Sequence, residues 1–313
     1  MNRFRMPLPR QSDASAGPIW IIHLGALGDW ILTWPALLCL RRAFPARRFV
    51  GIGRLDYLNL AVRFGVLDAA ADGESREMIG LFSGSGLPAG LDPPGGAVAW
   101  IREGERLAGL LRSSAALPVL LLDPVPERTG IHVARVHCEA IGREFPIRIP
   151  DDLTEGFPAH EPKSHHVLIH SGSGGERKNF EPEFYENIAF FLRENGHSKT
   201  AFLIGPAELD RGRFRAFRGQ NLIFPENTGA LADWLQNAVL FIGNDSGVSH
   251  LAGFMGIPSV VVYRSTDPGI WGVLGRNVHP VVADGAEAAF KGVLEGIAAI
   301  GPPQTPIPPS AGL

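Results

Sequence analysis

The feature that most constrains the fold is a short apolar run that ends in a glycine turn and continues as an apolar helix pattern. Residues 18–24 form an isoleucine-rich run, which suits a strand buried on both faces. The turn Gly25-Ala26-Leu27-Gly28-Asp29 follows, and then an apolar stretch with helical character extends to about residue 42. A second apolar run at 49–53 and a helix pattern at 55–64 complete the unit. Strand, helix and strand in this order predict a parallel sheet.

The same segment could be mistaken for a membrane anchor, because residues 19–40 are nearly all apolar. However, Asp29 lies near the centre of the run, where a carboxylate costs about 2.5–3.5 kcal/mol on insertion scales. Gly25, Gly28 and Pro35 also interrupt the run. These residues favour a strand, a turn and a helix over a membrane span.

The length of 313 residues suits two compact domains of about 150 residues each. Prolines and charged residues accumulate around 146–164, which is typical of a linker, and the strand–helix alternation resumes after it. We therefore expect a mobile arm at 1–17, a first domain at 18–160, a second at 161–300 and a disordered, proline-rich tail at 301–313.

The remaining elements follow from short apolar runs and helical periodicity. Strands are expected at 118–123, 166–170, 200–205, 239–243 and 259–263, and helices at 101–111, 182–194, 209–217, 230–236, 247–255 and 286–300. Residues 80–96 are rich in glycine and proline and predict a loop. That loop is either a surface connection or a mobile cover over a substrate site.

Composition excludes several classes of function. The formal charge of −3 comes from 29 basic and 32 acidic side chains, which argues against a nucleic-acid partner. Cys39 and Cys138 stand far apart and form no CxxC pair, so we expect no disulfide or zinc framework and a reducing, cytoplasmic compartment. The sequence contains no HExxH motif, and we expect neither a metal site nor a cofactor.

Three loops that follow predicted strands have the composition of anion sites. They are His170 to Gly175 with the nearby Lys178, Gly243 to His250, and Ser265-Thr266-Asp267-Pro268. Small residues after a strand present backbone N–H groups to phosphate, and a helix N-terminus adds a favourable dipole. Each loop could instead be an ordinary connection. Because the carboxyl ends of parallel strands share one edge, we expect these three loops and the turn Gly25 to Asp29 to line one crevice.

Asp29 is the strongest candidate for proton transfer. It lies just past the first glycine turn, at the start of a helix whose dipole favours the ionised carboxylate. A carboxylate held at the ligand-binding edge of a sheet can accept a proton from a substrate hydroxyl. The residue could equally be a simple helix cap, and the spacing alone does not decide between these roles.

These motifs resemble the ADP-heptose:lipopolysaccharide heptosyltransferase family, glycosyltransferase family 9. The residues that carry the resemblance are Gly25 to Asp29, Pro35-Ala36-Leu37, the small-residue loop before Lys178, Asp245 to His250, and Thr266-Asp267-Pro268 with Trp271. The match spans about residues 18–300 and keeps the family's order and spacing.

The resemblance implies an α/β fold of the GT-B type, in which two Rossmann-like domains with parallel sheets face each other across a cleft. Residues 18–160 would bind the acceptor and residues 161–300 the nucleotide sugar. It also implies inverting, metal-independent transfer, with ADP-heptose as the first guess for the donor. The acceptor would be a lipid-linked or other glycan in the synthesis of lipopolysaccharide or a related envelope glycan.

The resemblance also assigns roles to residues. Asp29 would be the general base that deprotonates the acceptor hydroxyl, and Gly25, Gly28 and His23 would lie on the acceptor side. The donor-binding set is Ser171, Gly172, Ser173, Lys178, Asp245, Ser246, Gly247, His250, Thr266 and Asp267.

The sequence departs from the family pattern at several positions. Pro124-Val125-Pro126 replaces a D-x-[QR]-G motif, and His23 stands where the family usually has Arg or Lys. No acidic residue that would bind the donor ribose is evident, and Glu226 is only nearby.

Two alternatives remain, namely a GT-B enzyme for a different sugar and a catalytically silent nucleotide-sugar-binding protein. The presence of Asp29 beside the donor motifs favours an enzyme. We expect the protein in the cytoplasm, with peripheral membrane contact through Arg3, Arg5 and Arg10.

Overall fold

The computed structural model describes residues 17–126, 130–162, 164 and 166–301. Apart from Gly17 and Gly301, the predicted arm and the predicted tail lie outside these described residues. The described chain divides into two compact units. Unit 1 takes its residues from 1–25, 36–126 and 137–149, and unit 2 takes its residues from 26–35, 127–136 and 150–313.

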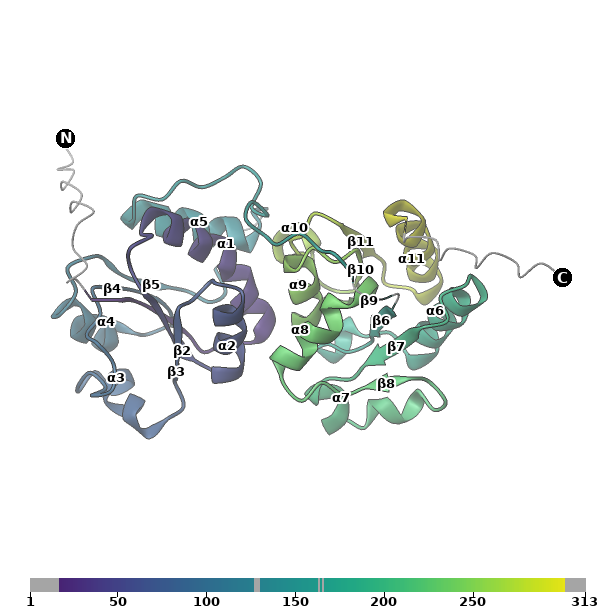
Figure 1. Ribbon diagram of the computed structural model, residues 1–313, viewed down its shortest axis with the longest axis horizontal. Coiled ribbons are helices and arrows are strands. Elements are labelled where there is room, and N and C mark those ends of the chain that lie inside the picture. Colours follow the sequence, from purple (N-terminus) through teal and green to yellow (C-terminus); the bar gives the residue numbers. More distant parts are fainter. Residues whose placement is uncertain (1–16, 127–129, 163, 165, 302–313) are drawn as a thin grey trace. The chain divides into compact units, whose positions relative to one another are not determined.

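Unit 1 is built on a five-stranded parallel sheet in the order β3-β2-β1-β4-β5 (Figure 1). Its strands are β1 (Ile19–His23), β2 (Phe49–Gly53), β3 (Ala69–Asp72), β4 (Gly96–Trp100) and β5 (Val119–Leu122). The accompanying helices are α1 (Leu27–Ala43), α2 (Leu55–Arg63), α3 (Ile79–Ser83), α4 (Glu105–Arg112) and α5 (Val133–Glu144), with a 3₁₀ turn at Arg76–Met78. The first turns of α1 and α5 count with unit 2.

Strand β1 lies at the centre of this sheet, between β2 and β4, and every one of its residues is buried. Successive side chains of a strand point to opposite faces, so Trp20 and Ile22 share one face. They pack there in a core that includes Leu107 and Leu111 of α4. Residues 19–23 of the apolar run predicted at 18–24 therefore form the central strand of the first parallel sheet, whereas Leu24 lies past the strand and is exposed.

The prediction of a loop at 80–96 is partly wrong. Its start belongs to helix α3, and its last residue, Gly96, begins β4. Leu81 is fully buried in the core, so tertiary packing stabilises a helix that the glycines around it disfavour. Gly84 ends the helix in the left-handed conformation, with φ of 75°.

Unit 2 contains a six-stranded parallel sheet in the order β11-β10-β9-β6-β7-β8. Its strands are β6 (His166–His170), β7 (Thr200–Leu203), β8 (Leu222–Ile223), β9 (Ala238–Asn244), β10 (Ser259–Tyr263) and β11 (Val278–Val282). Its helices are α6 (Pro182–Glu194), α7 (Pro206–Asp210), α8 (Thr228–Gln236), α9 (Gly247–Phe254), α10 (Pro268–Trp271) and α11 (Ala286–Ile300), with 3₁₀ turns at Glu176–Lys178 and Arg213–Ala216.

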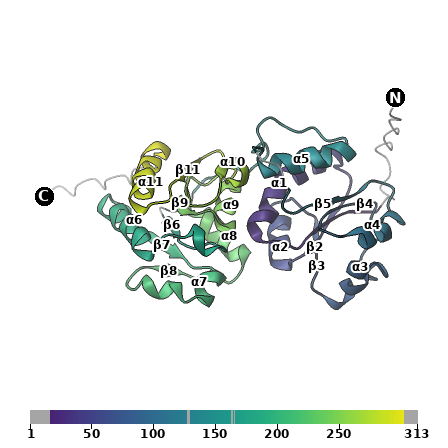
Figure 2. The ribbon, with the colours of Figure 1, turned by 180° about the vertical axis from the view of Figure 1, so that it is seen from behind.

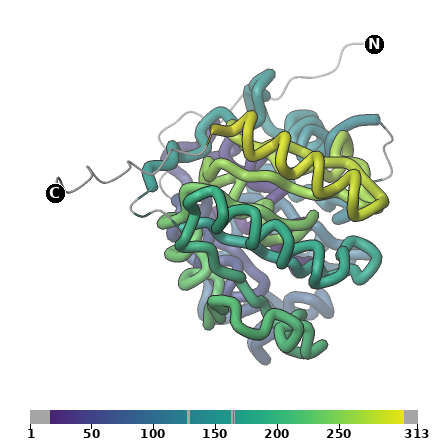
Figure 3. The backbone as a smooth tube through the Cα atoms, turned by 90° about the vertical axis from the view of Figure 1, so that its right-hand side faces the viewer, coloured from purple at the N-terminus to yellow at the C-terminus, as the bar shows by residue number. Residues whose placement is uncertain are grey.

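Helices cover both faces of the second sheet. Opposite views show α8 and α9 on one side of the strands and α6 and α11 on the other (Figures 1 and 2). Helices α6 and α11 run alongside each other (Figure 3). After β6 the chain passes to β7, and after β9 it passes to β10 on the opposite side. The sheet therefore has a topological switch point between β6 and β9, where α/β proteins bind ligands.

The helix predicted at 209–217 is replaced by two shorter elements, α7 and a 3₁₀ turn at Arg213–Ala216. Pro206 occupies the first turn of α7, a position that proline favours, so the helix begins earlier than expected. Gly212 has φ of 67° and separates α7 from the 3₁₀ turn. None of the helices in the described ranges combines the length and apolarity needed to cross a bilayer.

Candidate functional site

The carboxyl edge of the second sheet carries two of the predicted loops at its switch point. The loop after β6 begins with the buried residues Ser171, Gly172 and Ser173. The loop after β9 is shorter, because α9 begins at Gly247. Ser246 caps α9, with its Oγ accepting the Ser249 N–H at 3.3 Å. The structure therefore places residues 171–173 and 245–247 just past the carboxyl ends of two neighbouring central strands.

The loop after β6 exposes unpaired backbone donors. Among the described residues, the N–H groups of 172–177 have no hydrogen-bond acceptor. The Ser173 hydroxyl donates to the Asp245 carbonyl at 2.9 Å, which ties this loop to the loop after β9. Ser173 therefore contributes structure through its side chain. A row of unpaired N–H groups is the arrangement that binds phosphate.

Lys178, Asp245 and His250 form a charged cluster beside these loops. Lys178 Nζ lies 2.6 Å from Asp245 Oδ2, and His250 Nε2 lies 3.6 Å from Asp245 Oδ1. Burial by itself raises the pKa of the Asp245 carboxyl, but hydrogen bonds from His250 and Lys178 outweigh it and hold that pKa at about 2. Asp245 is therefore ionised at neutral pH and fixes the position of the Lys178 and His250 side chains.

Asp29 belongs to the same unit as this cluster. It occupies the first turn of α1, and that turn packs against the start of α9. A Cβ at Gly28 would lie 3.1 Å from His250 Cδ2, and one at Gly247 would lie 2.9 Å from Leu27 Cβ. The two helix starts thus approach each other closely because both positions are glycine. This close packing is the role that the structure gives to Gly28.

The pKa of the Asp29 carboxyl is raised above its usual value, and the main cause is burial. His250 and Lys178 lower that pKa, Asp245 raises it, and a backbone hydrogen bond from Ala26 lowers it. The sequence suggested that the helix dipole would favour the ionised form, but burial outweighs all these stabilising contributions. A raised pKa brings a carboxylate closer to the basicity that general-base catalysis at neutral pH requires.

The third predicted loop has local structural roles. Asp267 is exposed and caps the short helix α10, with its Oδ1 accepting the Gly269 N–H at 2.8 Å. Thr266 is half-buried beside it, after strand β10. This arrangement agrees with the simple turn that Asp267-Pro268 also suggested.

His23 and Gly25 lie in unit 1, at the end of β1. The Gly25 N–H donates to His23 Nδ1 at 3.2 Å, so the histidine stabilises the glycine turn. Burial, and then the nearby His137, lower the pKa of His23 to about 3. His23 is therefore neutral, unlike the cation that the family usually has at this position.

Glu208 is a candidate donor-site residue that the sequence analysis missed. Its side chain is buried after β7, and its Oε2 accepts the Gly205 N–H at 2.8 Å. A Cβ at Gly172 would overlap the Glu208 carboxylate, so the carboxylate lies directly against the loop after β6. In the sequence, Glu208 follows Gly205 by three residues, just after a predicted strand. That spacing equally indicates a helix capping box, so it does not single out a ligand-binding residue.

His132 is the second residue that the sequence analysis missed. Its Nε2 lies 2.9 Å from the Gly272 carbonyl, just after α10. Burial lowers its pKa, and the neighbouring His250 lowers it further. His132 thus lies near the charged cluster within unit 2, although no sequence motif surrounds it.

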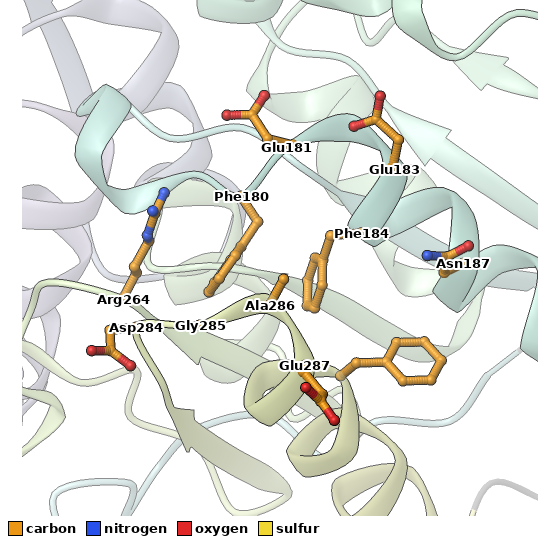
Figure 4. Close-up of a pocket in the computed structure, with 11 residues that line it drawn as sticks. Phe180, Glu181, Glu183, Phe184, Asn187, Arg264, Asp284, Gly285, Ala286 and Glu287 are labelled. Carbon is orange, nitrogen blue, oxygen red and sulfur yellow. The ribbon is translucent and has the colours of Figure 1, made fainter.

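A separate pocket of about 580 Å³ opens between the starts of α6 and α11 (Figure 4). Phe180 and Phe184 form part of its wall, and Arg264 extends beside Phe180. Its lining carboxylates are Glu181, Glu183, Asp284 and Glu287. Four carboxylates against one guanidinium make the pocket unfavourable for a diphosphate. The loops after β6 and β9 are therefore the better candidate for the donor site.

Among the described residues, no group of three or more His, Cys, Asp or Glu side chains is arranged to hold a metal ion. Metal independence of the reaction stays an expectation from the resemblance.

Comparisons with known proteins bear on the family and the fold of the chain. Residues 144–292 match the family model of glycosyltransferase family 9 (heptosyltransferase). Among curated proteins, no sequence matches the chain.

Solved structures of similar fold include a glycosyltransferase family 9 protein from Veillonella parvula DSM 2008. It is 18% identical with a TM-score of 0.69, and the match covers 91% of this chain and 97% of that one. E. coli heptosyltransferase WaaC with ADP is 17% identical with a TM-score of 0.70, over 90% and 99%. E. coli ADP-heptose lps heptosyltransferase II is 14% identical with a TM-score of 0.64, over 90% and 98%. The predicted GT-B type of fold, with two parallel-sheet Rossmann-like units, is confirmed.

Proposed function

Because residues 144–292 belong to glycosyltransferase family 9 (heptosyltransferase), we propose that this glycosyltransferase moves a sugar from an ADP-sugar to an acceptor hydroxyl. The donor is an ADP-heptose, and the acceptor is a lipid-linked or other glycan of lipopolysaccharide-type synthesis. The similar E. coli heptosyltransferase WaaC has been solved with ADP and with ADP-2-deoxy-2-fluoro heptose, which supports this choice.

One observation carries the proposal. The unpaired N–H groups of residues 172–177 lie at the switch point of the second sheet, next to the Lys178 ammonium. Together they form a site for a diphosphate, whose charge is delocalised over oxygens that accept such hydrogen bonds. The start of α9 at Gly247 adds the positive end of a helix dipole.

The donor nucleoside extends toward Glu208. A carboxylate next to a phosphate-binding loop is suited to accept hydrogen bonds from ribose hydroxyls. Glu208 Oε2 already accepts the Gly205 N–H, which fixes the carboxylate in place. Glu208 therefore fills the ribose-binding role for which the sequence offered only the nearby Glu226.

Asp29 acts as the general base. The acceptor oxygen attacks the anomeric carbon while the bond from that carbon to the diphosphate oxygen breaks, so the configuration inverts. The acceptor proton passes to the Asp29 carboxylate, and ADP leaves with the bonding electron pair. Lys178 and the N–H groups of the loop stabilise the charge that develops on ADP. No metal takes part in this scheme.

The test is a transfer assay on the purified protein with ADP-heptose and a glycan that lacks the terminal heptose. We expect ADP release and a heptose-extended acceptor, with inverted configuration at the anomeric carbon by NMR. Binding of ADP by calorimetry, compared with UDP and GDP, tests the nucleotide separately. If the protein binds no nucleoside diphosphate, the proposed donor site is wrong. If it binds ADP but transfers a sugar other than heptose, only the proposed sugar specificity must be revised.

A silent nucleotide-sugar-binding protein is the second candidate, because the donor loops alone would suffice for binding. Slow hydrolysis of the donor in the absence of acceptor distinguishes the two. Hydrolysis above the rate without protein supports the enzyme, and its absence together with tight ADP binding supports the silent binder.

A further inference from the structure

Three arginines outside the predicted site bind the backbone of the loop after β6. Arg211 follows α7, Arg213 begins the next 3₁₀ turn, and Arg264 follows β10. Arg211 Nη1 donates to the Ser173 carbonyl at 3.3 Å, and its Nη2 donates to the Gly174 carbonyl at 3.0 Å. One guanidinium thus holds two consecutive carbonyl groups, which a lysine ammonium cannot match in geometry.

The other two arginines hold the segment that follows Lys178. Arg264 Nη1 donates to the Asn179 carbonyl at 2.6 Å, and its guanidinium lies over the Phe180 ring at 5.0 Å. Figure 4 shows the Arg264 side chain extending beside Phe180. Arg213 Nη2 donates to the Phe180 carbonyl at 3.1 Å. The two carbonyls after Lys178 are therefore fixed from two different elements.

Peptide planarity links these carbonyl contacts to the unpaired donors. In a trans peptide unit the C=O of one residue and the N–H of the next point in opposite directions. Because Arg211 binds the carbonyls of Ser173 and Gly174, it turns the N–H groups of Gly174 and Gly175 to the opposite side of the loop. Those two N–H groups belong to the unpaired run at 172–177.

We propose that Arg211, Arg213 and Arg264 are positioning residues that aim the donor-binding loop, with Arg211 directing the N–H groups of Gly174 and Gly175 at the donor diphosphate. Arg213 and Arg264 fix the position of the neighbouring Lys178 by holding the backbone that follows it. Ordering these donors before the ligand arrives removes an entropic cost from binding. The inference rests on the proposed function, because it assumes that this loop binds a nucleoside diphosphate.

The chain offers a matched control. Arg215 lies in the same 3₁₀ turn as Arg213, and its guanidinium lies 5.8 Å from the Phe214 ring centroid. Its replacement removes the same charge from nearly the same place and leaves the described contacts of the loop intact. Arg211→Met and Arg215→Met therefore separate a specific contact from a general loss of positive charge.

The experiment measures the dissociation constant of ADP by calorimetry, the donor KM and kcat, and the thermal midpoint. We expect Arg211→Met to weaken ADP binding and raise the donor KM by about 3- to 30-fold, with a smaller change in kcat. Arg211→Lys should fail to restore affinity, because it keeps the charge but cannot hold both carbonyls. Arg264→Met and Arg213→Met should act in the same direction, and Arg215→Met should match the wild type.

Three outcomes separate the explanations, and one control accounts for a change in stability. Equal losses in Arg211→Met and Arg215→Met would overturn the proposal, because general charge would then account for both. Full affinity in Arg211→Lys would do the same. If Arg211→Met lowers the thermal midpoint, affinity measured at a temperature where both proteins are folded decides the matter. A wild-type protein that binds no nucleoside diphosphate would instead refute the proposed function on which this inference rests.

Discussion

Lys178 and Asp245 form an ion pair in which Nζ lies 2.6 Å from Oδ2 and the Asp245 side chain is only 5% exposed. The same carboxylate also lies 3.6 Å from His250 Nε2, so one buried anion fixes two side chains at the carboxyl edge of the second sheet. A diphosphate that binds there would meet a lysine that is already ordered. We infer that donor affinity depends on Lys178, whereas Asp245 sets where Lys178 lies.

Lys178→Ala should weaken ADP binding about 10- to 100-fold, because a charge-assisted hydrogen bond is worth about 1.5–3 kcal/mol. Calorimetry with ADP measures the change. Lys291→Ala is the control, because Lys291 is an exposed residue of α11 that pairs with Glu295. Unchanged affinity in Lys178→Ala would place the donor phosphates elsewhere.

The same pair predicts an acid-sensitive stability. The folded-state pKa of Asp245 is lowered to about 2, below the value of about 3.9 for an unfolded chain. Ionised Asp245 therefore stabilises the fold above that unfolded value, and the contribution is lost as the pH falls toward 2. The Asp245→Asn protein should have a lower free energy of unfolding than the wild type at neutral pH. Its free energy of unfolding should also depend less on pH between the folded-state and unfolded-state pKa values of Asp245. Urea unfolding between pH 2 and pH 7 tests this difference, and parallel curves for both proteins would contradict it.

Gly172 and Gly174 lie in one loop but differ in their surroundings. A Cβ at Gly172 would overlap the Glu208 carboxylate, whereas a Cβ at Gly174 would meet no atom within 4 Å. Gly172→Ala should lower the free energy of unfolding by about 1–3 kcal/mol and weaken ADP binding, because Glu208 must move. Gly174→Ala should change stability by less than about 0.5 kcal/mol. Denaturant unfolding measures the free energy of unfolding of both variants. Equal values would contradict the prediction, because Glu208 would then move without a loss of stability.

The sequence was sufficient to predict the elements with strong apolar patterns. The strand at 49–53 and the helix at 182–194 have the bounds that the structure shows. Strand β3 was missed because Ala69–Asp72 consists of three alanines and an aspartate, which have low strand propensity. Strand β4 was missed because a glycine-rich stretch leads directly into Gly96–Trp100.

The site was only partly predictable, because its chemistry depends on contacts between distant segments. The motifs placed Asp245 and Lys178 near each other, since both follow central strands of one sheet. Neither motif nor spacing could show that Glu208 lies against Gly172, or that Arg211 holds the carbonyls of its loop. The direction of the Asp29 pKa shift was also predicted wrongly. The sequence shows the helix start, whose dipole lowers the pKa, but it does not show the burial that raises the pKa.

The raised pKa of Asp29 predicts the pH dependence of transfer. A general base acts only when it is deprotonated, so kcat/KM should fall as the pH falls through the folded-state pKa of Asp29. Because burial raises that pKa, the fall should begin at a higher pH than for an ordinary aspartate. A pH–rate profile at subsaturating concentrations of donor and acceptor measures the pH at which kcat/KM falls. A profile that stays flat down to the pKa of an ordinary aspartate would contradict this role.

The substitution Asp29→Asn separates catalysis from helix capping. It keeps the shape and the capping ability of the side chain but removes its basicity, so transfer should slow by about 100- to 10,000-fold. Stability should not fall with it. When the folded-state pKa of a carboxyl is raised, the free energy of unfolding of the protein falls as the pH rises from the unfolded-state pKa to the folded-state pKa. At neutral pH the wild-type protein is therefore destabilised by the ionised Asp29. Asp29→Asn should therefore be at least as stable as the wild type at neutral pH, and that difference should vanish below about pH 4.

Asp152→Asn provides the control, because Asp152 is exposed, accepts the Thr154 N–H through its Oδ1 at 2.8 Å and lies outside the proposed site, so it should tolerate the same change with near-normal turnover. The measurement combines turnover, ADP affinity and thermal midpoint for both variants. Slow transfer with normal ADP binding and an undiminished midpoint in Asp29→Asn identifies the base, because a cap would leave turnover intact. Near-normal transfer by Asp29→Asn would end that assignment, and the acceptor proton would then have to leave by another route.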